Sequence, residues 1–313
     1  ATAGWYNTAA FEEIATADGL YAKTLNGDAY SAEMKEQTIE TIKKDLGQVD
    51  MVIYSIAAPR RTAPDGVTYK SVLKTTGESY TNRTIDLRNN QLMEATIEPA
   101  TDEEIQNTIK VMGGEDWILW IKALKEAGVL ADGAKTVAYS YIGPELTYPI
   151  YKEGSIGQAK KDLYASADKI QAEIDGVEAY VSVNKAVVTQ SSAAIPIVPL
   201  YLAILFKVMK EQKVQEGCIE QMYRMIHDRL CNGGAVVTDE NRLIRMDDWE
   251  MEPKVQEAVA EIWQKIDQDN LEEVTDLEGY WQEFYEIFGF RIDGVDYGAD
   301  VDADVQIPSI AAE

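Results

Sequence analysis

Three apolar runs, each about the length of one strand, place the strongest limit on how this chain of 313 residues can fold. They are VDMVIYSIAA at Val49 to Ala58, KTVAYSYI at Lys135 to Ile142, and YVSVNKAVVTQ at Tyr180 to Gln190. Strands that are apolar on both faces are typical of a parallel sheet covered by helices on both sides. Helical patterns separate the runs, so the alternation predicts an α/β fold with a parallel sheet and right-handed crossovers.

The helical patterns have recognisable ends. One begins at Ser31 and stops before Gly47, and another has Thr101 and Glu104 in the spacing of a capping box. The segment from residue 60 to residue 88 is rich in Thr, Gly and Lys, which favours an irregular excursion or a hairpin. The predicted helices cover residues 31–46, 101–112, 117–127 and 155–174.

The second half of the chain has a different character. Residues 199–287 are mostly helical in pattern, and the acidic stretch from Gly289 to Val305 resembles a loop. No internal repeat or low-complexity linker marks a boundary. We therefore expect a single domain over residues 1–313, with a Rossmann-like part at 1–198 and a mostly helical part with an acidic tail at 199–313.

Charge excludes several classes of partner. The chain has 54 acidic and 29 basic residues, a formal net charge of -25, which disfavours nucleic acid and anionic membrane surfaces. No signal peptide and no run of 18 apolar residues is visible, so a cytoplasmic protein without a membrane span is expected. Cys218, Cys231 and His227 lack the spacing of a zinc site, so no metal is expected. The pattern around His227 indicates a structural residue on a helix.

The most promising chemistry lies after the strand predicted at residues 135–142. Ligands of parallel sheets bind beyond the carboxyl ends of the strands. Tyr151 lies there in a turn, and Lys160 lies one or two turns into the next helix. A nearby ammonium favours the phenolate, which makes a tyrosine a better proton donor, and it can also hydrogen-bond a nicotinamide ribose. This pair suits reduction of a carbon–carbon double bond conjugated to a carbonyl.

Spacing alone does not identify such a pair. The chain contains 17 tyrosines, so a tyrosine and a lysine nine positions apart occur easily by chance. The segment Gly154-Ser155-Ile156-Gly157 before the helix could form a phosphate-binding nest, although two glycines are a weak signal.

A family resemblance strengthens the interpretation. The string TYPIYKEGSIGQAKKDL at Thr147 to Leu163 resembles the signature of the trans-2-enoyl-CoA reductases, also called FabV-type enoyl-acyl-carrier-protein reductases. That family is an outlying branch of the short-chain dehydrogenase/reductases. In this branch eight residues separate the tyrosine and the lysine, more than in the common branch, and Tyr151 and Lys160 have this separation. Further matching strings are GWYNTAAF (4–11), YAKTLNGDAY (21–30), VIYSIAAPRRT (52–62), VMGGEDW (111–117), AVVTQSSAAIPIVPLYLAILFKVMKE (186–211), EGCIEQMYR (216–224) and FGFRIDGVDYGADV (288–301).

The resemblance implies roles for individual residues. Tyr151 and Lys160 match the catalytic pair, with Tyr151 as the proton donor and Lys160 also binding the cofactor. Tyr141 matches the tyrosine that contacts the substrate carbonyl. Asp28 and Ala29 match the pair beside the adenine, and Ile56 and Ala57 match a backbone pair after the next strand. The nicotinamide end corresponds to Val187, Val188 and Thr189.

The implied activity is NADH-dependent reduction of trans-2-enoyl-CoA, or of enoyl-acyl-carrier-protein, to the saturated thioester in fatty acid synthesis, by a monomer or homodimer. The family pattern begins with a strand, a glycine-rich phosphate loop and a helix, and this unit is absent from the sequence before Gly4. We therefore expect an N-terminally truncated chain with an exposed sheet edge. The alternatives are a catalytically incomplete fragment or subunit, which binds an acyl thioester or a partner chain without turnover, and a reductase of another carbonyl or alkene. Arg60, Arg61 and Lys161 could offset the charge of CoA, but solvated surface positions are expected for them.

Overall fold

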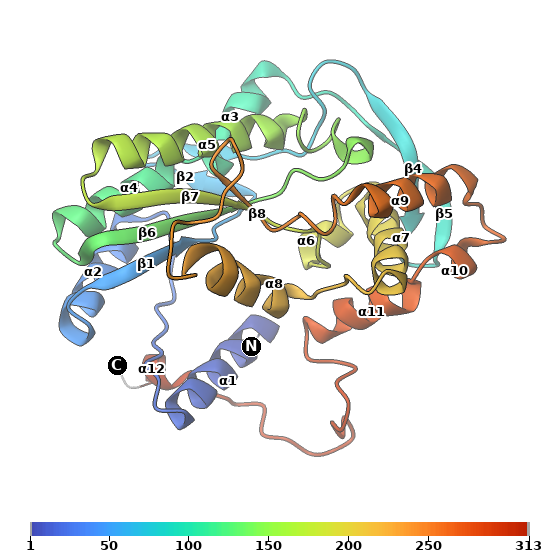
Figure 1. The fold of residues 1–313 in the computed structure, drawn as a ribbon. Helices are drawn as coiled ribbons and strands as arrows, with labels where there is room; N and C mark the ends of the chain where they lie inside the picture. Colours follow the sequence, from blue (N-terminus) through green and yellow to red (C-terminus); the bar gives the residue numbers. More distant parts are fainter. Residues whose placement is uncertain (1, 312–313) are drawn as a thin grey trace.

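The computed structural model describes residues 2–311 and has a parallel four-stranded sheet at its centre (Figure 1). The strands follow the order β1-β6-β7-β8, and each neighbouring pair is parallel. The α/β, Rossmann-like prediction is confirmed. The strands are β1 (Val49–Tyr54), β6 (Leu130–Ser140), β7 (Val177–Val183) and β8 (Leu243–Arg245).

The three apolar runs correspond to β1, β6 and β7, with shifted ends. Strand β7 stops at Val183, so residues 184–189 form a loop where the sequence predicted strand. Strand β8 lies in the segment expected to be mostly helical. It has only three residues, and it exists because β7 offers it hydrogen-bonding partners.

Helices cover both faces of the sheet (Figure 1). On one face lie α2 (Ala32–Asp45), α3 (Asp102–Met112), α4 (Glu115–Glu126) and α5 (Ser155–Glu173). On the other face lies α8 (Cys218–Arg224), which continues as a π-helical segment, η2 (Met225–Leu230). The capping box predicted for α3 is present, since Thr101 and Glu104 bond each other's backbone N–H groups. Each face therefore buries an apolar core against the sheet.

Trp117 is the largest fully buried side chain of the core beneath α4 and α5. Its Nε1 donates to Thr136 Oγ1 on β6 at 2.9 Å, and that hydroxyl donates to Val52 O on β1 at 3.0 Å. We expect Trp117→Ala to lower the free energy of unfolding by about 3–5 kcal/mol, because it leaves a large cavity and an unsatisfied hydroxyl.

Urea unfolding followed by circular dichroism would measure this loss. Tyr223→Ala is a suitable control, because that large aromatic ring is 66% exposed and its removal should change stability by no more than about 0.5 kcal/mol. Equal midpoints for the two variants would contradict the central position of Trp117.

A second, helical layer covers the carboxyl ends of the strands (Figure 1). It consists of α6 (Gln190–Ala193), α7 (Val198–Glu211), α9 (Pro253–Lys265), α10 (Leu271–Val274) and α11 (Leu277–Glu286). Residues 60–88, expected to be an irregular excursion or a hairpin, belong to two hairpins that extend to residue 97. These are β2 (Arg60–Thr62) with β3 (Thr68–Lys70) and β4 (Tyr80–Asp86) with β5 (Gln91–Ile97). Arg83 on β4 donates to Trp263 O at 2.9 Å and Ile266 O at 3.1 Å, which anchors this hairpin to α9.

The two ends of the described chain lie together (Figure 1). Helix α1 (Ala3–Ala17) contacts the returning acidic tail, where Trp5 Nε1 donates to Val305 O at 2.6 Å. Buried Glu12 accepts from the Ser309 N–H at 2.9 Å and hydroxyl at 2.7 Å, at the start of α12 (Pro308–Ala311). The tail itself is loop-like, as its sequence predicted.

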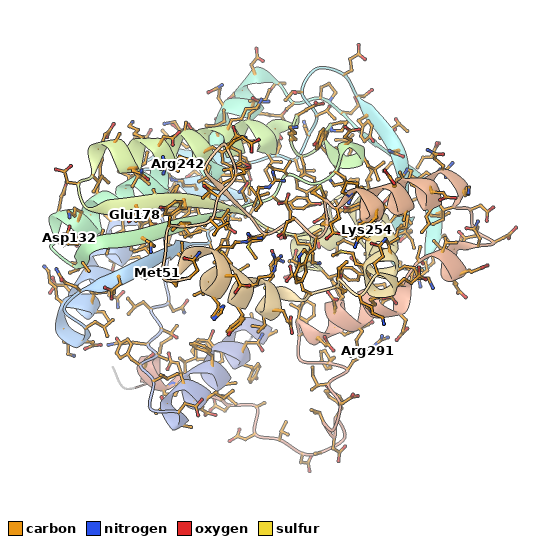
Figure 2. All side chains as sticks on the ribbon, viewed as in Figure 1. Met51, Asp132, Glu178, Arg242, Lys254 and Arg291 are labelled. Atoms are coloured by element: carbon orange, nitrogen blue, oxygen red, sulfur yellow. The ribbon has the colours of Figure 1, made fainter. Side chains whose placement is uncertain are left out.

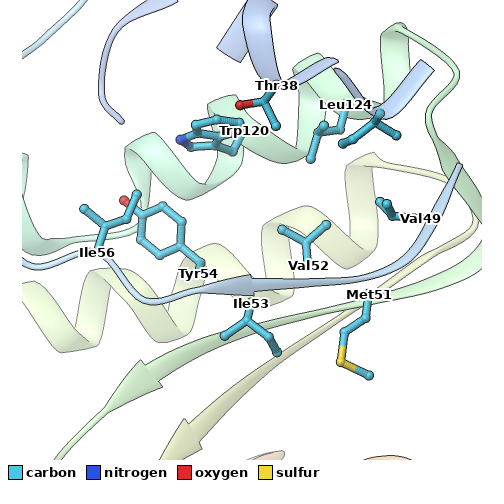
Figure 3. Close-up of a pocket in the computed structure, with 10 residues that line it drawn as sticks. Thr38, Val49, Met51, Val52, Ile53, Tyr54, Ile56, Trp120 and Leu124 are labelled. Atoms are coloured by element: carbon cyan, nitrogen blue, oxygen red, sulfur yellow. The ribbon is translucent and has the colours of Figure 1, made fainter. Parts of the chain in front are cut away.

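Strand β1 lies at an edge of the sheet. It pairs with β6 on one side, and within residues 2–311 no strand pairs with its other side. An apolar groove of about 300 Å³ runs along it (Figure 3), where Val52 and Tyr54 lie on the same side as Trp120, and Met51 and Ile53 point to the opposite face. The exposed edge expected from the sequence is therefore present.

Two acidic side chains lie near the amino ends of the strands. Figure 2 labels Asp132 and Glu178 near the amino ends of β6 and β7, whereas the carboxyl ends point toward α6 and α7. Arg61 is an exception to the expected solvated surface position. It is 2% exposed, with Nη1 donating to Lys110 O at 2.7 Å. No helix within residues 2–311 combines the length and apolarity needed to cross a bilayer.

Candidate active site

A cavity of about 350 Å³ opens at the carboxyl ends of β6 and β7. Its walls come from the loops after β1, β6 and β7 and from the first turns of α5 and α7. The lining is mainly apolar with a few amine and hydroxyl groups, which is typical of a site for a small organic ligand. Of the residues proposed from the sequence, it brings together Ala57, Tyr141, Tyr151, Lys160, Val187 and Thr189.

Tyr151 is fixed by the turn that follows β6. The short 3-10 helix η1 (Glu145–Thr147) ends with the Thr147 carbonyl accepting from Tyr151 N at 2.9 Å. The Tyr151 ring is 9% exposed and packs edge-to-face on Tyr141, with 4.9 Å between ring centroids. Its hydroxyl makes no hydrogen bond to any group within residues 2–311, so it is available to a ligand in the cavity.

The pKa of Tyr151 shifts in the direction opposite to the one expected. The sequence suggested that the Lys160 ammonium would favour the phenolate. Burial instead raises the pKa of Tyr151, and the negative charge of Glu250 raises it further. Tyr151 therefore stays a protonated phenol at neutral pH, which suits a hydrogen-bond and proton donor.

Lys160 lies in the second turn of α5, where it is partly buried at the cavity wall. Its Nζ donates to Tyr139 O at the end of β6, at 3.1 Å. Burial lowers the pKa of Lys160 to about 8, and none of the carboxylates that the structure describes forms an ion pair with it. An ammonium with one backbone bond retains two N–H groups for a ligand.

Tyr141 has a protein partner, unlike Tyr151. Its hydroxyl donates to Glu250 Oε1 at 3.0 Å, and Tyr201 on α7 donates to the same oxygen at 2.6 Å. Glu250 Oε2 accepts from Ala186 N at 2.7 Å, in the loop after β7. The strand-end loops and the helical layer are thus joined through one buried carboxyl.

The loop after β7 leads directly into α6. Thr189 caps this short helix, because its hydroxyl accepts from Ser192 N at 2.9 Å and its own N–H donates to the Ser192 hydroxyl at 2.8 Å. Val187 and Thr189 line the cavity, whereas Val188 is buried in the neighbouring core.

The glycines before α5 serve packing rather than anion binding. The Ser155 N–H, which a phosphate nest would need, donates to Lys74 O at 2.9 Å. A Cβ on Gly154 would lie 2.6 Å from Ile150 O, and one on Gly157 would lie 2.2 Å from Tyr151 O. The phosphate-nest hypothesis is therefore wrong, and these glycines allow α5 to approach the Tyr151 turn closely.

The remaining candidates lie outside the cavity. Asp28 and Ala29 form the turn before α2, where Ala29 O accepts from Trp120 Nε1 on α4 at 3.0 Å. Asp28 is exposed and its carboxylate accepts from Tyr30 N at 3.0 Å. Ile56 lines the groove along β1. An extended dinucleotide would need contacts at such separated places.

Comparison with known proteins identifies the family to which this chain belongs. A model of the trans-2-enoyl-CoA reductase catalytic region matches residues 1–231, and a model described as the enoyl reductase FAD binding domain matches residues 238–301. The chain belongs to the trans-2-enoyl-CoA reductase family. The family expected from the sequence resemblance is therefore confirmed.

Individual members of the trans-2-enoyl-CoA reductase family are similar over nearly the whole chain. The NADH trans-2-enoyl-CoA reductase of Ruminiclostridium cellulolyticum is 55% identical over 99% of this chain and 79% of its own length. The NADH enoyl-acyl-carrier-protein reductase of Psychromonas ingrahamii is 54% identical, with the same shares covered. The structure of the Treponema denticola trans-2-enoyl-CoA reductase in complex with NAD superposes with a TM-score of 0.93 at 49% identity, over 95% of this chain and 75% of that one.

The flavin in the name of the second family model does not fit the residues present. The strand of that region, β8, is followed by Asp247, Asp248 and Glu250 rather than by glycines. Asp247 accepts from Arg245 at 2.7 Å, and Asp248 accepts from Arg224 at 2.9 Å. Carboxylates at a strand end repel a diphosphate, and the neighbouring cations are already paired.

Two charged residues at or behind the cavity wall were not found from the sequence of this trans-2-enoyl-CoA reductase family member. Glu250 is one of 54 acidic residues and has no local motif, so only the fold brings it to Tyr141. Lys185 is 2% exposed and donates to Ala186 O at 2.8 Å. A lysine within an otherwise apolar strand-end segment was the one available signal for it. Within residues 2–311, no three His, Cys, Asp or Glu side chains lie close enough to hold a metal ion.

Proposed function

We propose that this protein reduces trans-2-enoyl thioesters of CoA or acyl carrier protein to the saturated acyl thioesters with NADH, in fatty acid synthesis. The observation that carries the proposal is the cavity at the strand ends, which both Tyr151 and Lys160 line, with no partner for the Tyr151 hydroxyl among residues 2–311. Membership of a family whose relatives are named as NADH enoyl reductases supports it.

Tyr151 is the proton donor in this proposal. NADH, when bound, supplies the hydride that adds to the β carbon of the enoyl group. Negative charge then develops on the thioester oxygen, and the Tyr151 hydroxyl donates a hydrogen bond to that oxygen and stabilises the enolate. Tyr151 transfers its proton to the enolate and regains one from solvent, and the product is the saturated thioester with the new proton at its α carbon. The apolar lining of the cavity excludes water, which strengthens this interaction. Tyr141 lies beside it and contacts the same end of the substrate.

Lys160 holds the cofactor beside Tyr151. Its ammonium retains N–H groups for a ligand and forms no ion pair with a carboxylate of residues 2–311, so it fits the hydroxyl groups of a ribose. Val187, Val188 and Thr189 would contact the nicotinamide end, Ile56 and Ala57 would lie alongside through their backbone, and Asp28 and Ala29 would face the adenine. This order follows the carboxyl edge of the sheet.

Steady-state kinetics with NADH and crotonyl-CoA test the proposal. Loss of NADH absorbance that depends on crotonyl-CoA, with butyryl-CoA as the product, is the expected result. A panel with an enoyl-acyl-carrier-protein and simple ketones separates a thioester reductase from a reductase of other carbonyls. Binding of acyl thioester without NADH oxidation would replace the proposal by a non-catalytic role.

The charge on Lys160 predicts an alkaline limit to activity. Because burial lowers its pKa from 10.5 to about 8, Lys160 loses its proton as pH rises through that value. We expect kcat/KM for NADH to fall roughly tenfold between about pH 7 and about pH 9, as the ammonium fraction falls by that factor.

Lys160→Arg is the matched test of that limit, because a guanidinium stays charged throughout this range. The variant should have a lower kcat/KM at neutral pH but a flat profile up to about pH 9. The same alkaline fall in the variant and the parent protein would assign the limit to another group.

We further propose a cytoplasmic location and a monomer or homodimer as the assembly. Free, exposed Cys218 and Cys231 suit a reducing compartment. Residues 1–198 and 199–313 are proposed to act as one reductase domain. What supports this is the hydrophobic core that combines Ile85, Ile150 and Tyr151 with side chains of α7, α9 and α11.

A further inference from the structure

We propose that Glu250 determines which of two touching cavity tyrosines, Tyr141 or Tyr151, donates to the substrate. By accepting the Tyr141 proton, it leaves Tyr151 as the phenol whose proton is free to enter the cavity. Glu250 is thus a positioning residue for the reaction. This inference rests on the proposed function, and it assigns a task to a residue outside the Tyr151 and Lys160 motif.

Glu250 is buried, and hydrogen bonds hold both oxygens of its carboxyl group. The residue is 0% exposed, and three donors converge on its carboxyl group. Oε1 receives the hydroxyls of Tyr141 at 3.0 Å and Tyr201 at 2.6 Å, and Oε2 receives the N–H of Ala186 at 2.7 Å. Gln256 Nε2 donates to the Glu250 carbonyl at 2.7 Å and to the Tyr201 hydroxyl at 3.2 Å.

Counting protons decides the direction of each bond. A backbone N–H only donates, so Oε2 must accept from Ala186. Tyr201 already accepts from Gln256, so its own proton points to Oε1. An ionised carboxylate accepts from Tyr141 as well, and the single Tyr141 proton is then committed to the protein.

The surroundings of Glu250 contain opposing influences. Burial raises its pKa, whereas the hydrogen bonds from Tyr201 and Ala186 and the positive charge of Lys185 act in the opposite direction. Lys185 Nζ donates to the carbonyl of Ala186, and the N–H of Ala186 donates to Glu250. One residue, Ala186, therefore bonds both the ammonium and the carboxylate. The net effect raises the pKa of Glu250, with burial as the largest cause, while the three donors that converge on its carboxyl group fit the ionised form, which only accepts hydrogen bonds.

Tyr151 differs from Tyr141 in the hydrogen bonding of its hydroxyl group. The two rings touch edge-to-face and both line the cavity. Within residues 2–311, only Tyr141 of the two has a hydrogen-bonded hydroxyl. Glu250 lies in the region that matches the second family model, residues 238–301, so that region contributes to the reductase site itself.

The decisive experiment reverses the hydrogen-bond polarity. In Glu250→Gln the amide oxygen must face the Ala186 N–H, so the NH₂ group replaces Oε1 and donates to Tyr141. The Tyr141 proton is then released into the cavity. We expect Tyr151→Phe to be nearly inactive, and Tyr151→Phe/Glu250→Gln to recover kcat for crotonyl-CoA by at least about tenfold over Tyr151→Phe.

Two further variants assign the recovery. Adding Tyr141→Phe to the double variant should abolish it, because the released proton belongs to Tyr141. Glu283→Gln in the Tyr151→Phe background should give no recovery. Glu283 is a partly buried carboxyl group that, like Glu250, interacts electrostatically with Lys185. It accepts a hydrogen bond from Gln215 rather than from a cavity tyrosine.

A second measurement leaves residue 250 unchanged and applies if the double variant folds poorly. Lowering the pH protonates Glu250, which then donates to Tyr141, so the residual kcat of Tyr151→Phe should rise while that of the parent protein does not. The ionisable groups that face Glu250 are Tyr141, Tyr151, Tyr201, Lys185 and Asp247. An acid-insensitive residual rate overturns the proposal.

The outcomes separate this inference from the proposed function. A parent protein that does not reduce crotonyl-CoA contradicts the function. An active parent protein, an inactive Tyr151→Phe and a folded double variant without recovery contradict the role of Glu250 alone.

Discussion

Tyr151→Phe is expected to lower kcat for crotonyl-CoA reduction by about a thousandfold, since general acid catalysis typically contributes a factor of this order. The substitution removes a cavity phenol whose proton has no acceptor among residues 2–311, and it preserves the ring that packs on Tyr141. The hydroxyl bonds no group within residues 2–311, so its loss leaves no buried partner unsatisfied. We therefore expect thermal unfolding to stay within a few degrees of the parent protein.

Tyr148→Phe is the matched control for this prediction. Tyr148 lies in the same turn, but it faces Lys152 rather than the cavity. Removing its hydroxyl should leave kcat within about twofold of the parent value, because surface substitutions away from a site have small effects. A Tyr151→Phe enzyme with more than about a tenth of the parent kcat would contradict the proton-donor assignment.

Gly157→Ala is expected to affect both stability and turnover. The added methyl group would lie 2.2 Å from two backbone carbonyl oxygens, those of Tyr151 and Lys152, and neither can rotate away as a flexible side chain could. The turn must move, which should lower the free energy of unfolding by about 3 kcal/mol, the upper end of typical overpacking costs. Because this turn carries Tyr151, kcat should also fall by at least about tenfold.

Urea unfolding and crotonyl-CoA kinetics on one protein preparation measure both effects. Gly234→Ala makes the same chemical change where the nearest atom, Asn232 Oδ1, is 3.6 Å from the new Cβ. That variant should match the parent protein in both measurements. A Gly157→Ala protein with parent stability would show that α5 can move without disturbing the turn.

The sequence predicted the elements whose formation depends on local pattern. Strand β6 is apolar on both faces because helices cover both, and helix α3 is signalled by its own capping box. Strand β1 has the same apolar pattern, although Ile53 is 37% exposed at the sheet edge. Strand β8 could not be predicted, because three residues become a strand only through pairing with β7. The end of β7 was misplaced, since the apolar loop after it is buried by α7 rather than by the sheet.

The residues of the candidate site also fall into those that a local pattern predicts and those that only the fold brings together. Tyr151 and Lys160 were found because a short continuous motif contains both, and the structure places both at one cavity. Glu250 is 109 residues from Tyr141, so its hydrogen bond depends on the whole fold. The direction of the Tyr151 pKa was predicted wrongly for a related reason. Burial and the charge of Glu250 dominate, and neither can be seen in a stretch of ten residues.

The contact between the two ends of the chain has a consequence for local unfolding. Glu12 and Ser309 are separated by 297 positions but share two hydrogen bonds, and Trp5 binds the carbonyl of Val305. Helix α1 therefore derives part of its stability from the last segment of the chain rather than from its neighbours in sequence. We expect the first and last segments to open as one cooperative unit in amide hydrogen exchange, separately from the central sheet.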